Sequence, residues 1–519
     1  MYRSDQERSQ ALRPAPRRRA TGYILDMPPL AFTRRAILRA PAQLAALAAL
    51  PAPLARAQFP APEPLEDQRL AFVTTTASRP WQPGSLFRPS FSWTLLNLNL
   101  DLDLASAPAR APIAGFGACF NELGWQALLA LPEDGRRQVL DLLFAPGAGL
   151  GLRLGRLPMG ASDYALEWHS YDETDGDYAL EHFSLARDRE RLFPYVREAL
   201  ARCPGMRLFA SPWSPPTWMK QPRACNFGTL RWEPRVLEAY ARYFLKYVQG
   251  CRAEGIPVAQ VHVQNEPAAD QKFPSCVWTG AQLRDFIRDH LGPLMAREAP
   301  GTEVWLGTLN GPFHDYGLEG VTRDGLTQGY AQYAGPVLND PQARRFVAGV
   351  GYQWGGKHVL AQTRDAWPEL RLMQTENECG DGRNTWDYAH YVFDLIRHYF
   401  RHGVEAYVYW NPVLEQGGTS TWGWRQNTLV SVDRERGTWT LNPEFHLLRH
   451  FCPFLQPGAR PLALSGPWAA HAAAFGNPDG SRVLVAANPY PEPQALVLGD
   501  AQGGWRLELA PGAFATWVF

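Results

Sequence analysis

The sequence predicts an α/β fold: a (β/α)8 TIM barrel with a flanking β-sandwich domain built from strands at both ends of the chain. Two observations lead to this prediction. First, short continuous apolar segments, typical of strands buried on both faces, alternate eight times with helix-length amphipathic segments. Second, segments typical of β-strands lie on both sides of that repeat, so they are expected to form one sandwich beside the barrel.

The expected strands and helices follow from this pattern in chain order. Before the repeat, residues 70–76 and 93–102 are expected to be strands. The eight barrel strands are expected at residues 113–120, 151–158, 206–211, 260–264, 303–308, 347–353, 370–375 and 405–410. Between them lie amphipathic helices such as 235–253 and 281–295. The tail is expected to return to strands at residues 482–488, 495–498 and 513–519.

The chain is expected to have five parts along its length. They are an export signal of the twin-arginine type at 1–57, a linker at 58–68, N-terminal sandwich strands at 69–110, the catalytic barrel at 111–427 and C-terminal sandwich strands at 428–519.

Residues 1–57 have the features of a targeting signal rather than of a folded domain. Residues 33–39 (TRRAILR) contain an arginine pair, an Ala/Leu-rich stretch follows at 42–54, and residues 55–57 (ARA) fit a small-x-small cleavage site. The stretch is too short and too interrupted by proline to span a bilayer. We therefore expect a periplasmic or secreted protein without an integral membrane segment in its mature chain. Whether translation starts at Met1 or Met27 stays open.

Composition and charge narrow the class of partner. The formal net charge is +0, but a basic excess is concentrated in the expected export signal, so the mature chain is mildly acidic. Nucleic acid is therefore not expected as a partner. The 7 cysteines contain no CxxC pair and the 12 histidines no HExxH motif, so we expect no metal and no other cofactor. One disulfide stays open, and the sequence carries no prediction of oligomeric state.

Two segments, residues 261–267 (VHVQNEP) and 372–378 (LMQTENE), carry the clearest chemical signal. Each begins as an apolar strand and reaches a glutamate, Glu266 or Glu376, where the strand ends. Barrel active sites lie at the carboxyl ends of the strands, so these two carboxylates are expected to meet there. Such a pair cleaves glycosidic bonds: one group protonates the leaving oxygen while the other attacks or activates water at the anomeric carbon. Glu378 is the alternative to Glu376 as the second carboxylate, because residues two apart on a strand face the same side.

Other strand ends of the predicted barrel supply amides, indoles and charged groups. This combination suits a sugar, whose hydroxyls need hydrogen bonds and whose apolar ring face packs on aromatic side chains. The expected substrate-binding residues are Asp163, Trp213, Asn265, Trp354, Trp410, Asn411 and Arg156. Trp422 and Trp424, near or in a glycine-rich loop, are open candidates for the mouth of the site.

The order of these motifs resembles glycoside hydrolase family 30, which includes the acid β-glucosidases that cleave glucosylceramide. The motifs are GFG (115–117), LPMGASDY (157–164), SPWSPPTWMK (211–220), QNEP (264–267), TENECG (375–380) and YWNP (409–412). The resemblance covers roughly residues 111 to 519. It implies a retaining mechanism with Glu266 as acid/base and Glu376 as nucleophile. It also implies that Asp163 holds distal sugar hydroxyls.

The remaining site residues have expected roles with structural alternatives. Asn265 is expected to bond the sugar 2-hydroxyl, and Arg156 to orient a carboxylate, with an internal salt bridge as its alternative. Trp213, Trp354 and Trp410 are expected to stack on the sugar, with core packing as their alternative.

One segment departs from the glucosylceramide-cleaving members of that family. Those relatives have His where this sequence has Gln353, and they have Tyr directly after the tryptophan, where this sequence has Gly355. The orientation of the nucleophile and the nature of the aglycone are therefore open. Lys357 and His358 are candidates to replace the missing contact.

The predicted function is that of a retaining β-glycoside hydrolase without a cofactor. The expected partner is a carbohydrate or glycolipid substrate, a β-glucoside that is either glucosylceramide-like or an oligosaccharide. A β-1,6-glucanase or a β-xylosidase of the same family is the nearest alternative. A barrel that binds carbohydrate without catalysis is the alternative from another class, although both glutamates are present.

Overall fold

The structure is a computed structural model that describes residues 69–87, 97–100, 111–311, 330–500 and 503–519. The expected export signal and linker lie outside these residues, as do 93–96 and 101–102 of the expected second strand. Within the described ranges, no helix combines the length and the apolar character that crossing a membrane requires.

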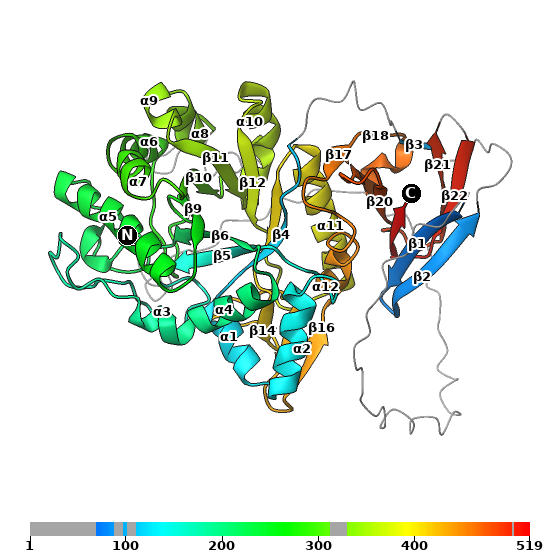
Figure 1. Ribbon diagram of the computed structural model, residues 1–519, viewed down its shortest axis with the longest axis horizontal. Coiled ribbons are helices and arrows are strands. Elements are labelled where there is room, and N and C mark those ends of the chain that lie inside the picture. Colours follow the sequence, from blue (N-terminus) through cyan, green and yellow to red (C-terminus); the bar gives the residue numbers. More distant parts are fainter. Residues whose placement is uncertain (1–68, 88–96, 101–110, 312–329, 501–502) are drawn as a thin grey trace, which may run out of the picture. The chain divides into compact units, whose positions relative to one another are not determined.

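A sheet of eight parallel strands forms the centre of the larger part of the fold (Figure 1). Its spatial order is β12-β11-β10-β9-β6-β5-β4-β13, so the strands follow one another around the sheet in chain order. The strands are β4 (Gly115–Cys119), β5 (Leu154–Met159), β6 (Arg207–Pro212), β9 (Val258–His262), β10 (Glu303–Leu309), β11 (Val347–Gln353), β12 (Arg371–Glu376) and β13 (Ala406–Tyr409). This order and direction confirm the predicted TIM barrel.

The barrel closes between its last two strands. β13 pairs in parallel with β4, the first strand. On its other side, the backbone amide of Glu405 donates to the carbonyl of Leu372 at 2.8 Å, and the amide of Trp410 donates to Asn377 Oδ1 at 2.7 Å. Side chains thus take part in the closure and fix the ends of β12 and β13 next to each other.

Helices follow the strands and surround them (Figure 1). They are α1 (Glu122–Leu129), α2 (Glu133–Phe144), α3 (Ala186–Arg191), α4 (Phe193–Arg202), α5 (Pro234–Ala253), α6 (Gly280–Phe286), α7 (Gly292–Glu298), α8 (Tyr330–Leu338), α9 (Pro341–Arg344), α10 (Leu360–Ala366), α11 (Trp386–Arg401) and α12 (Pro443–Leu448). Local signals set their ends: Thr279 and Gln282 form a capping box at α6, and Thr385 caps α11. The single helix expected at 281–295 is α6, a π-helical turn and α7. Pro293, which has no amide hydrogen for a regular helical bond, explains the irregularity.

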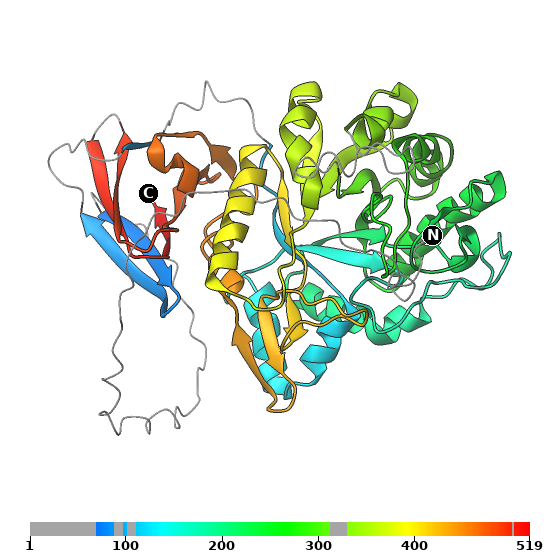
Figure 2. The ribbon, with the colours of Figure 1, turned by 180° about the vertical axis from the view of Figure 1, so that it is seen from behind.

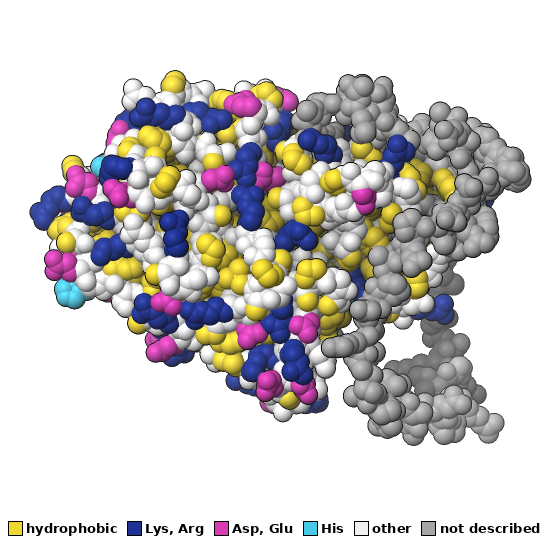
Figure 3. All heavy atoms as spheres, viewed as in Figure 1, with side chains coloured by type: hydrophobic (Ala, Val, Ile, Leu, Met, Phe, Trp, Pro, Cys, Tyr) yellow, Lys and Arg dark blue, Asp and Glu magenta, His cyan; other side chains and the backbone are white. Residues whose placement is uncertain are grey.

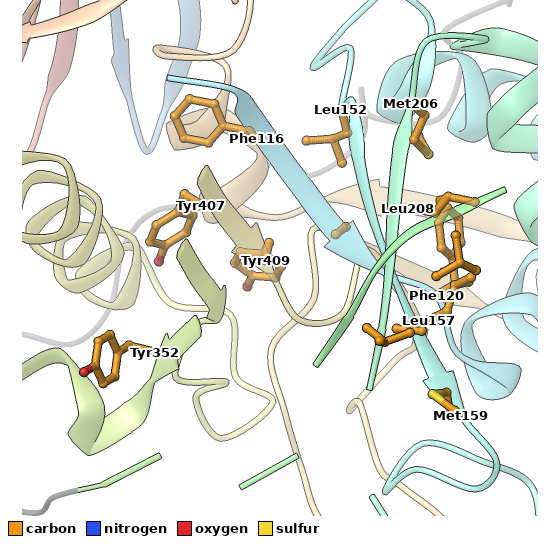
Figure 4. Packing of buried hydrophobic residues seen from close by; sticks show 14 of the residues in the cluster. Phe116, Phe120, Leu152, Leu157, Met159, Met206, Leu208, Tyr352, Tyr407 and Tyr409 are labelled. Atoms are coloured by element: carbon orange, nitrogen blue, oxygen red, sulfur yellow. The ribbon is translucent and has the colours of Figure 1, made fainter. Parts of the chain in front are cut away.

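Apolar side chains from neighbouring strands and helices fill the barrel's main core (Figure 4). Phe116 on β4 and Tyr407 on β13 lie opposite each other, with ring centroids 6.3 Å apart. Leu157 and Met159 on β5 and Leu208 on β6 are buried in the same cluster. Close packing fixes the position of each strand, including its carboxyl end. The loops that begin at these ends are therefore anchored to a rigid part of the fold.

Strands from both ends of the chain form the β-sandwich, as predicted (Figure 2). One sheet contains β17 (Arg460–Leu462), β19 (Ala472–Gly476), β20 (Arg482–Ala487), β23 (Phe514–Val518), β1 (Arg69–Thr76) and β2 (Arg79–Phe87). The other contains β18 (Leu464–Ser465), β3 (Asn97–Leu100), β21 (Gln494–Asp500) and β22 (Gly503–Leu509). β1 pairs with β23 and β3 with β21, so segments about 400 residues apart in sequence share each sheet. Leu484, Leu496, Leu507 and Trp517 pack in the sandwich's own core.

In the sequence between the last barrel strand and α12, three short strands form a small separate sheet. It consists of β14 (Val413–Glu415), β15 (Val430–Asp433) and β16 (Thr438–Leu441). The loop between β14 and β15 carries Trp422 and Trp424. The domain boundaries at 111, 427 and 428 stay predictions.

Acidic and basic side chains are interspersed on the face of the described molecule that Figure 3 shows. Ion pairs also link such side chains within the described residues. Arg288 contacts Asp285, Asp289 and Asp340, and Arg202 contacts Asp141 and Glu198.

Candidate active site

A cavity of about 310 Å³ opens where the barrel strands end. Both predicted glutamates, Glu266 and Glu376, line it, together with Asp163, Asn265, Trp213 and Trp354. These residues come from five different strand ends, which is the arrangement expected of a barrel active site. Six of the nine residues predicted from sequence therefore meet in one space.

Glu376, the last residue of β12, is held by side-chain donors on both oxygens. Its Oε2 accepts from Arg156 Nη1 at 2.5 Å and from Gln353 Nε2 at 3.3 Å. Its Oε1 accepts from Trp354 Nε1 at 3.2 Å. Burial raises the pKa of Glu376 above its ordinary value, and the charge of Arg156 and these hydrogen bonds offset part of that rise. The donors favour the ionised carboxylate, which is the form a nucleophile needs.

Arg156 on β5 is fully buried and connects the nucleophile candidate to Asn265. Its Nη2 donates to Asn265 Oδ1 at 2.5 Å and to Ser211 Oγ at 3.0 Å. Thr308 Oγ1 donates to the same Asn265 oxygen at 3.0 Å. Because Oδ1 is occupied by these donors, the amide nitrogen of Asn265 is the group left for a ligand in the cavity. Arg156 thus has the expected geometry of a residue that orients a carboxylate.

Glu266 follows β9 and has a different environment. Its backbone is left-handed, with φ of 49°, a conformation that is costly for a residue with a side chain and that clusters at functional sites. Its amide donates to the Thr308 carbonyl at 3.0 Å, which fixes the turn. Burial and the negative charge of Glu376 raise the pKa of Glu266 to about 8. A carboxyl group with such a pKa is protonated at neutral pH and can serve as an acid.

One amide nitrogen joins the two glutamates. Gln353 Nε2 lies 3.2 Å from Glu266 Oε1 and 3.3 Å from Glu376 Oε2. These two carboxylate oxygens are therefore at most about 6.5 Å apart, a limit that is compatible with the separation of about 5–5.5 Å in retaining glycosidases.

Tryptophans form one side of the site. Trp213 lines the cavity and stacks on Trp410, with ring centroids 5.3 Å apart, and the guanidinium of Arg156 lies 4.5 Å from the Trp213 ring centroid. Trp410 is behind Trp213 and does not line the cavity, so its placement differs from the expected sugar contact. Trp354 lines the cavity with a left-handed backbone, φ 46°, which turns its indole toward Glu376.

A line of amides leads from the barrel end to Asp163. Asn121 Nδ2 donates to Asn411 Oδ1 at 3.0 Å, and Asn411 Nδ2 donates to Gln426 Oε1 at 2.8 Å. The side chain of Gln426 in turn hydrogen-bonds the Asp163 carboxylate. Asn411 is fully buried and lies outside the cavity wall, so the structure places it behind Gln426 rather than in the expected contact with substrate.

Asp163 has one oxygen that is ready for a ligand. Its Oδ1 is buried and accepts no hydrogen bond from the described residues. Burial, together with the charge of Glu376, raises the pKa of Asp163 to about 8. Because an unpaired buried oxygen is costly, a sugar hydroxyl that bonds Oδ1 is favoured.

Glu378, the competitor for the nucleophile, has another partner. Its Oε1 lies 2.8 Å from Lys357 Nζ, and it is not among the residues that line the cavity. Lys357, a candidate to replace a missing contact with the nucleophile, thus pairs with Glu378 instead. Trp354 and Gln353 provide the contacts to Glu376.

The sequence interpretation overlooked several residues of the cavity wall. They are Gln426, Ala268, Ala269, Gln271, Phe273 and Asn310. Asn310 directly follows β10, so its place at the end of a barrel strand could have identified it as a candidate site residue. Gln426 lies in a loop far from any barrel strand in the sequence, and no motif indicates its position. Trp424, an open candidate, does line the cavity, and Trp422 stacks on Trp168. Among the described residues, no group of three or more His, Cys, Asp or Glu side chains could hold a metal ion.

Comparisons with known proteins agree with this geometry. Residues 113–455 match the family model of the glycosyl hydrolase family 30 TIM-barrel domain. Lysosomal acid glucosylceramidase of Mus musculus is 27% identical over 426 residues, 77% of this chain and 79% of that protein. Endo-1,6-beta-D-glucanase of Neurospora crassa is 26% identical over 426 residues, 78% of this chain and 85% of that one.

A solved structure shares the fold. The crystal structure of SrfJ from Salmonella typhimurium superposes with a TM-score of 0.75 at 23% identity, over 87% of this chain and 99% of that one. The family model covers more than half of this chain and includes the strand ends that carry Glu266 and Glu376. The chain belongs to glycoside hydrolase family 30.

Proposed function

We propose that the protein is a retaining β-glycosidase in which Glu376 is the nucleophile and Glu266 the acid/base. One observation carries the proposal: two carboxyl groups in different protonation environments face one cavity and share the Gln353 amide. The environment of Glu266 favours its neutral form, and the donors around Glu376 favour its charged form. This division between an acid and a nucleophile is what double displacement requires.

In the first step, Glu266 gives its proton to the glycosidic oxygen while Glu376 attacks the anomeric carbon. The bond between this carbon and the leaving oxygen breaks, and a bond to the Glu376 carboxylate forms. Oε2 of Glu376 is bound by both Arg156 and Gln353, whereas Oε1 accepts from Trp354 at 3.2 Å and from the thiol of Cys379 at 4.0 Å. Both contacts to Oε1 are longer than the 2.5 Å bond from Arg156 to Oε2, and we assign the attack to Oε1.

In the second step, Glu266 acts as a base. Having lost its proton, it takes one from a water molecule that replaces the aglycone, and this water attacks the anomeric carbon of the glycosyl-enzyme. The bond to Glu376 breaks, and the sugar leaves with its original configuration. Asn265 Nδ2 and Asp163 Oδ1, the free polar groups of the cavity, are proposed to hold sugar hydroxyls during both steps.

A β-glucoside is the proposed substrate. The cavity, at about 310 Å³, is at the small end of ligand sites, which span roughly 300–1,000 Å³. It therefore suits one sugar ring, with the aglycone toward the mouth. The similarity to a glucosylceramidase and to an endo-1,6-beta-D-glucanase supports glucose as that sugar. It leaves two aglycones to compare, a ceramide-like lipid and a further glucose unit, and the second makes β-1,6-glucanase activity the second candidate.

A panel of substrates tests the proposal. Aryl β-glycosides of glucose, xylose, galactose, fucose and glucuronic acid are offered to the wild type and to Glu376→Gln, beside glucosylceramide in detergent micelles and a β-1,6-glucan. Cleavage of the glucoside by the wild type alone is the expected result, with the β-anomer as the first product in proton NMR. An α-anomer as first product would exclude retention. Binding of sugars without turnover by folded wild-type protein would favour the non-catalytic alternative.

A further inference from the structure

Gln353, the last residue of β11, holds its amide in a single orientation. The residue is fully buried. Its Oε1 accepts from Thr375 Oγ1 at 3.0 Å and lies 3.5 Å from Arg156 Nη1, and both of these groups are donors. The amide cannot be turned over without placing its NH2 group against them. Nε2 must therefore face the two glutamates, with Asn265 Oδ1 as a third and more distant acceptor at 3.4 Å.

Charged or titratable groups surround this amide, together with the neutral Thr375 and Asn265. Arg156 comes from β5, Glu376 from β12 and Glu266 from the end of β9. Asp163, from the loop after β5, and the thiols of Cys119 and Cys379 complete the surroundings of the carboxylates. Gln353 does not titrate, so its amide keeps both hydrogens of Nε2 at every pH at which the glutamates change charge.

The contacts to Glu266 distinguish its two oxygens. Oε1 lies 3.2 Å from Gln353 Nε2, and among the described residues no other side chain donates to this carboxyl group. When Glu266 is protonated, a proton on Oε1 would point at the N–H of Gln353 and cost that hydrogen bond. A proton on Oε2 leaves the bond intact.

We propose that Gln353 is a positioning residue that reserves Oε2 of Glu266 for the transferable proton while it binds Oε2 of Glu376. The inference rests on the proposed function and deepens it. In the first step the O–H bond at Glu266 Oε2 breaks and a new O–H bond forms on the leaving oxygen, which keeps the electron pair of the broken bond to the anomeric carbon. Glu266 becomes a carboxylate, and Gln353 still binds its Oε1.

The same contact serves the second step. The carboxylate of Glu266 takes a proton from the attacking water on Oε2, since Oε1 is bound by the amide. A proton thus arrives at the atom from which the next one leaves, and the acid is restored without rotation of the carboxyl group. Glu376 Oε2 stays bound to Arg156 and Gln353 throughout, while the covalent bond forms at Oε1, which gives up its hydrogen bond from Trp354.

Gln353→Met tests the proposal, because methionine has a similar length and no N–H group. The hydrogen bonds from Gln353 lower the pKa of both glutamates. Without them, both limbs of the pH profile of kcat/KM should move to higher pH, by about one unit each. The proton of Glu266 is also less well placed, so substrates with poor leaving groups should lose on the order of tenfold more rate than activated aryl glycosides.

Gln374→Met is the matched control. Gln374 is equally buried on β12, and its Oε1 accepts from the amide of Val408 at 2.5 Å, with no contact to either glutamate. This variant should lower the unfolding temperature and leave both pH limbs in place. If Gln353→Met lowers the plateau without moving the limbs, Gln353 only packs the site, and the proposal is wrong.

Neutron diffraction of the deuterated wild type gives a test that does not depend on how a variant folds. Below pH 7, density for deuterium is expected on Glu266 Oε2, with the two Gln353 deuterons directed at Glu266 Oε1 and Glu376 Oε2. Deuterium on Glu266 Oε1 would overturn the inference. The proposed function fails separately, if Glu376→Gln hydrolyses the aryl glycosides as fast as the wild type does.

Discussion

Glu266 and Glu376 share one cavity, yet the side chains around them give them opposite tendencies. Glu376 accepts from four side chains, which are Arg156, Gln353, Trp354 and, at 4.0 Å, the thiol of Cys379. Gln353 alone among the described side chains donates to Glu266. Hydrogen bonds to a carboxylate favour its charged form, and burial without them favours its neutral form. The two glutamates therefore titrate as a coupled pair in which Glu376 ionises first.

Glu376→Ala is predicted to lose on the order of 10⁴-fold or more in kcat, because it removes the carboxylate that is proposed to form the covalent intermediate. Added azide should occupy the vacated space and restore part of the turnover, with an α-glycosyl azide as product. Rates with and without azide and NMR of the product provide the measurement. Glu378→Gln is the matched control: it alters a carboxyl group paired with Lys357 outside the cavity, and it should keep the activity. The reverse pattern would make Glu378 the nucleophile.

Glu266→Ala is predicted to slow substrates with poor leaving groups by about 10²–10⁴-fold and to spare the first step with activated aryl glycosides, which need no acid. The wild type should lose kcat/KM as pH rises through about 8, because the acid form of Glu266 disappears there. Initial rates from pH 4 to 10 with both kinds of substrate test this. The alkaline limb should be absent in the variant. A limb that persists near pH 8 would assign it to another group, with Asp163 as the first candidate.

The sequence could predict which polar residues lie near the ends of strands. It could not predict which of them point into the cavity and which contact only other side chains. Glu376 ends an apolar strand, and Asn265 and Glu266 come three and four residues after the end of another, which is a visible signal. The positive φ of Glu266 has no such signal, since glycine is absent there and the strain is imposed by the fold. Asn411 has the same position at a strand end, yet its amide faces other side chains, a difference of orientation that strand position does not reveal.

At the scale of elements, the barrel strands were predictable because each is buried on both faces and is therefore apolar throughout. This pattern did not predict β2 and β19, which are two strands of the sandwich. β2 lies at the edge of its sheet, where proline is tolerated, and its sequence RPWQPGSLF has the composition of a turn. β19 has the sequence AAAFG, whose alanines favour a helix, and only the neighbouring strands β17 and β20 make it a strand.

The loops after β5 and after β14 act as one unit. Tyr164 donates its hydroxyl hydrogen to the Gly418 carbonyl at 2.7 Å, and Thr421 Oγ1 donates to the Ala165 carbonyl at 2.5 Å. These bonds link the loop that carries Asp163 with the loop that precedes Gln426. The positions of Asp163 and Gln426 in the cavity wall therefore depend on each other and on Asn411, two residues after β13.

Asn411→Leu tests this dependence. It removes the hydrogen bonds to Asn121 and Gln426, which should cost about 1–3 kcal/mol in the free energy of unfolding and raise KM severalfold more than it lowers kcat. Urea unfolding and steady-state kinetics measure the two effects. Gln426→Ala is the matched variant, because Gln426 is the member of the same hydrogen-bonded series that lines the cavity. It should raise KM with a smaller loss in the free energy of unfolding. Unchanged KM in Asn411→Leu would show that Gln426 needs no support from it.

At the scale of the whole described molecule, the barrel and the sandwich meet through buried polar contacts. Trp386 Nε1 on α11 donates to the Gly512 carbonyl at 2.6 Å. His450, just after α12, contacts Thr516 Oγ1 on β23 at 2.9 Å and Thr75 Oγ1 on β1 at 2.8 Å. One imidazole thus joins the end of the barrel to strands from both ends of the chain, and these contacts could not be inferred from strand or helix patterns.

The hydrogen bonds around His450 define its neutral form. Thr516 donates its hydroxyl hydrogen to the His450 carbonyl, so its oxygen accepts from Nδ1–H. Nε2 is then the acceptor for the hydroxyl of Thr75. Burial lowers the pKa of His450 from 6.5 to about 3, and the charge of Arg449 adds to this effect. Between these two pH values the unfolded chain binds a proton that the folded protein does not, so stability falls as pH falls.

His450→Gln should therefore weaken the acid sensitivity of the fold. The glutamine amide has a donor and an acceptor for the two threonines and does not titrate. Between pH 7 and pH 5 the wild type should lose about 2 kcal/mol more of its free energy of unfolding than the variant, as measured by urea unfolding at both pH values. His182→Gln, at an exposed pair with Asp177 that raises the pKa of His182, is the control, and it should not flatten the pH dependence. Equal losses in the wild type and His450→Gln would mean that other buried groups, and not the junction of barrel and sandwich, set the acid limit of the fold.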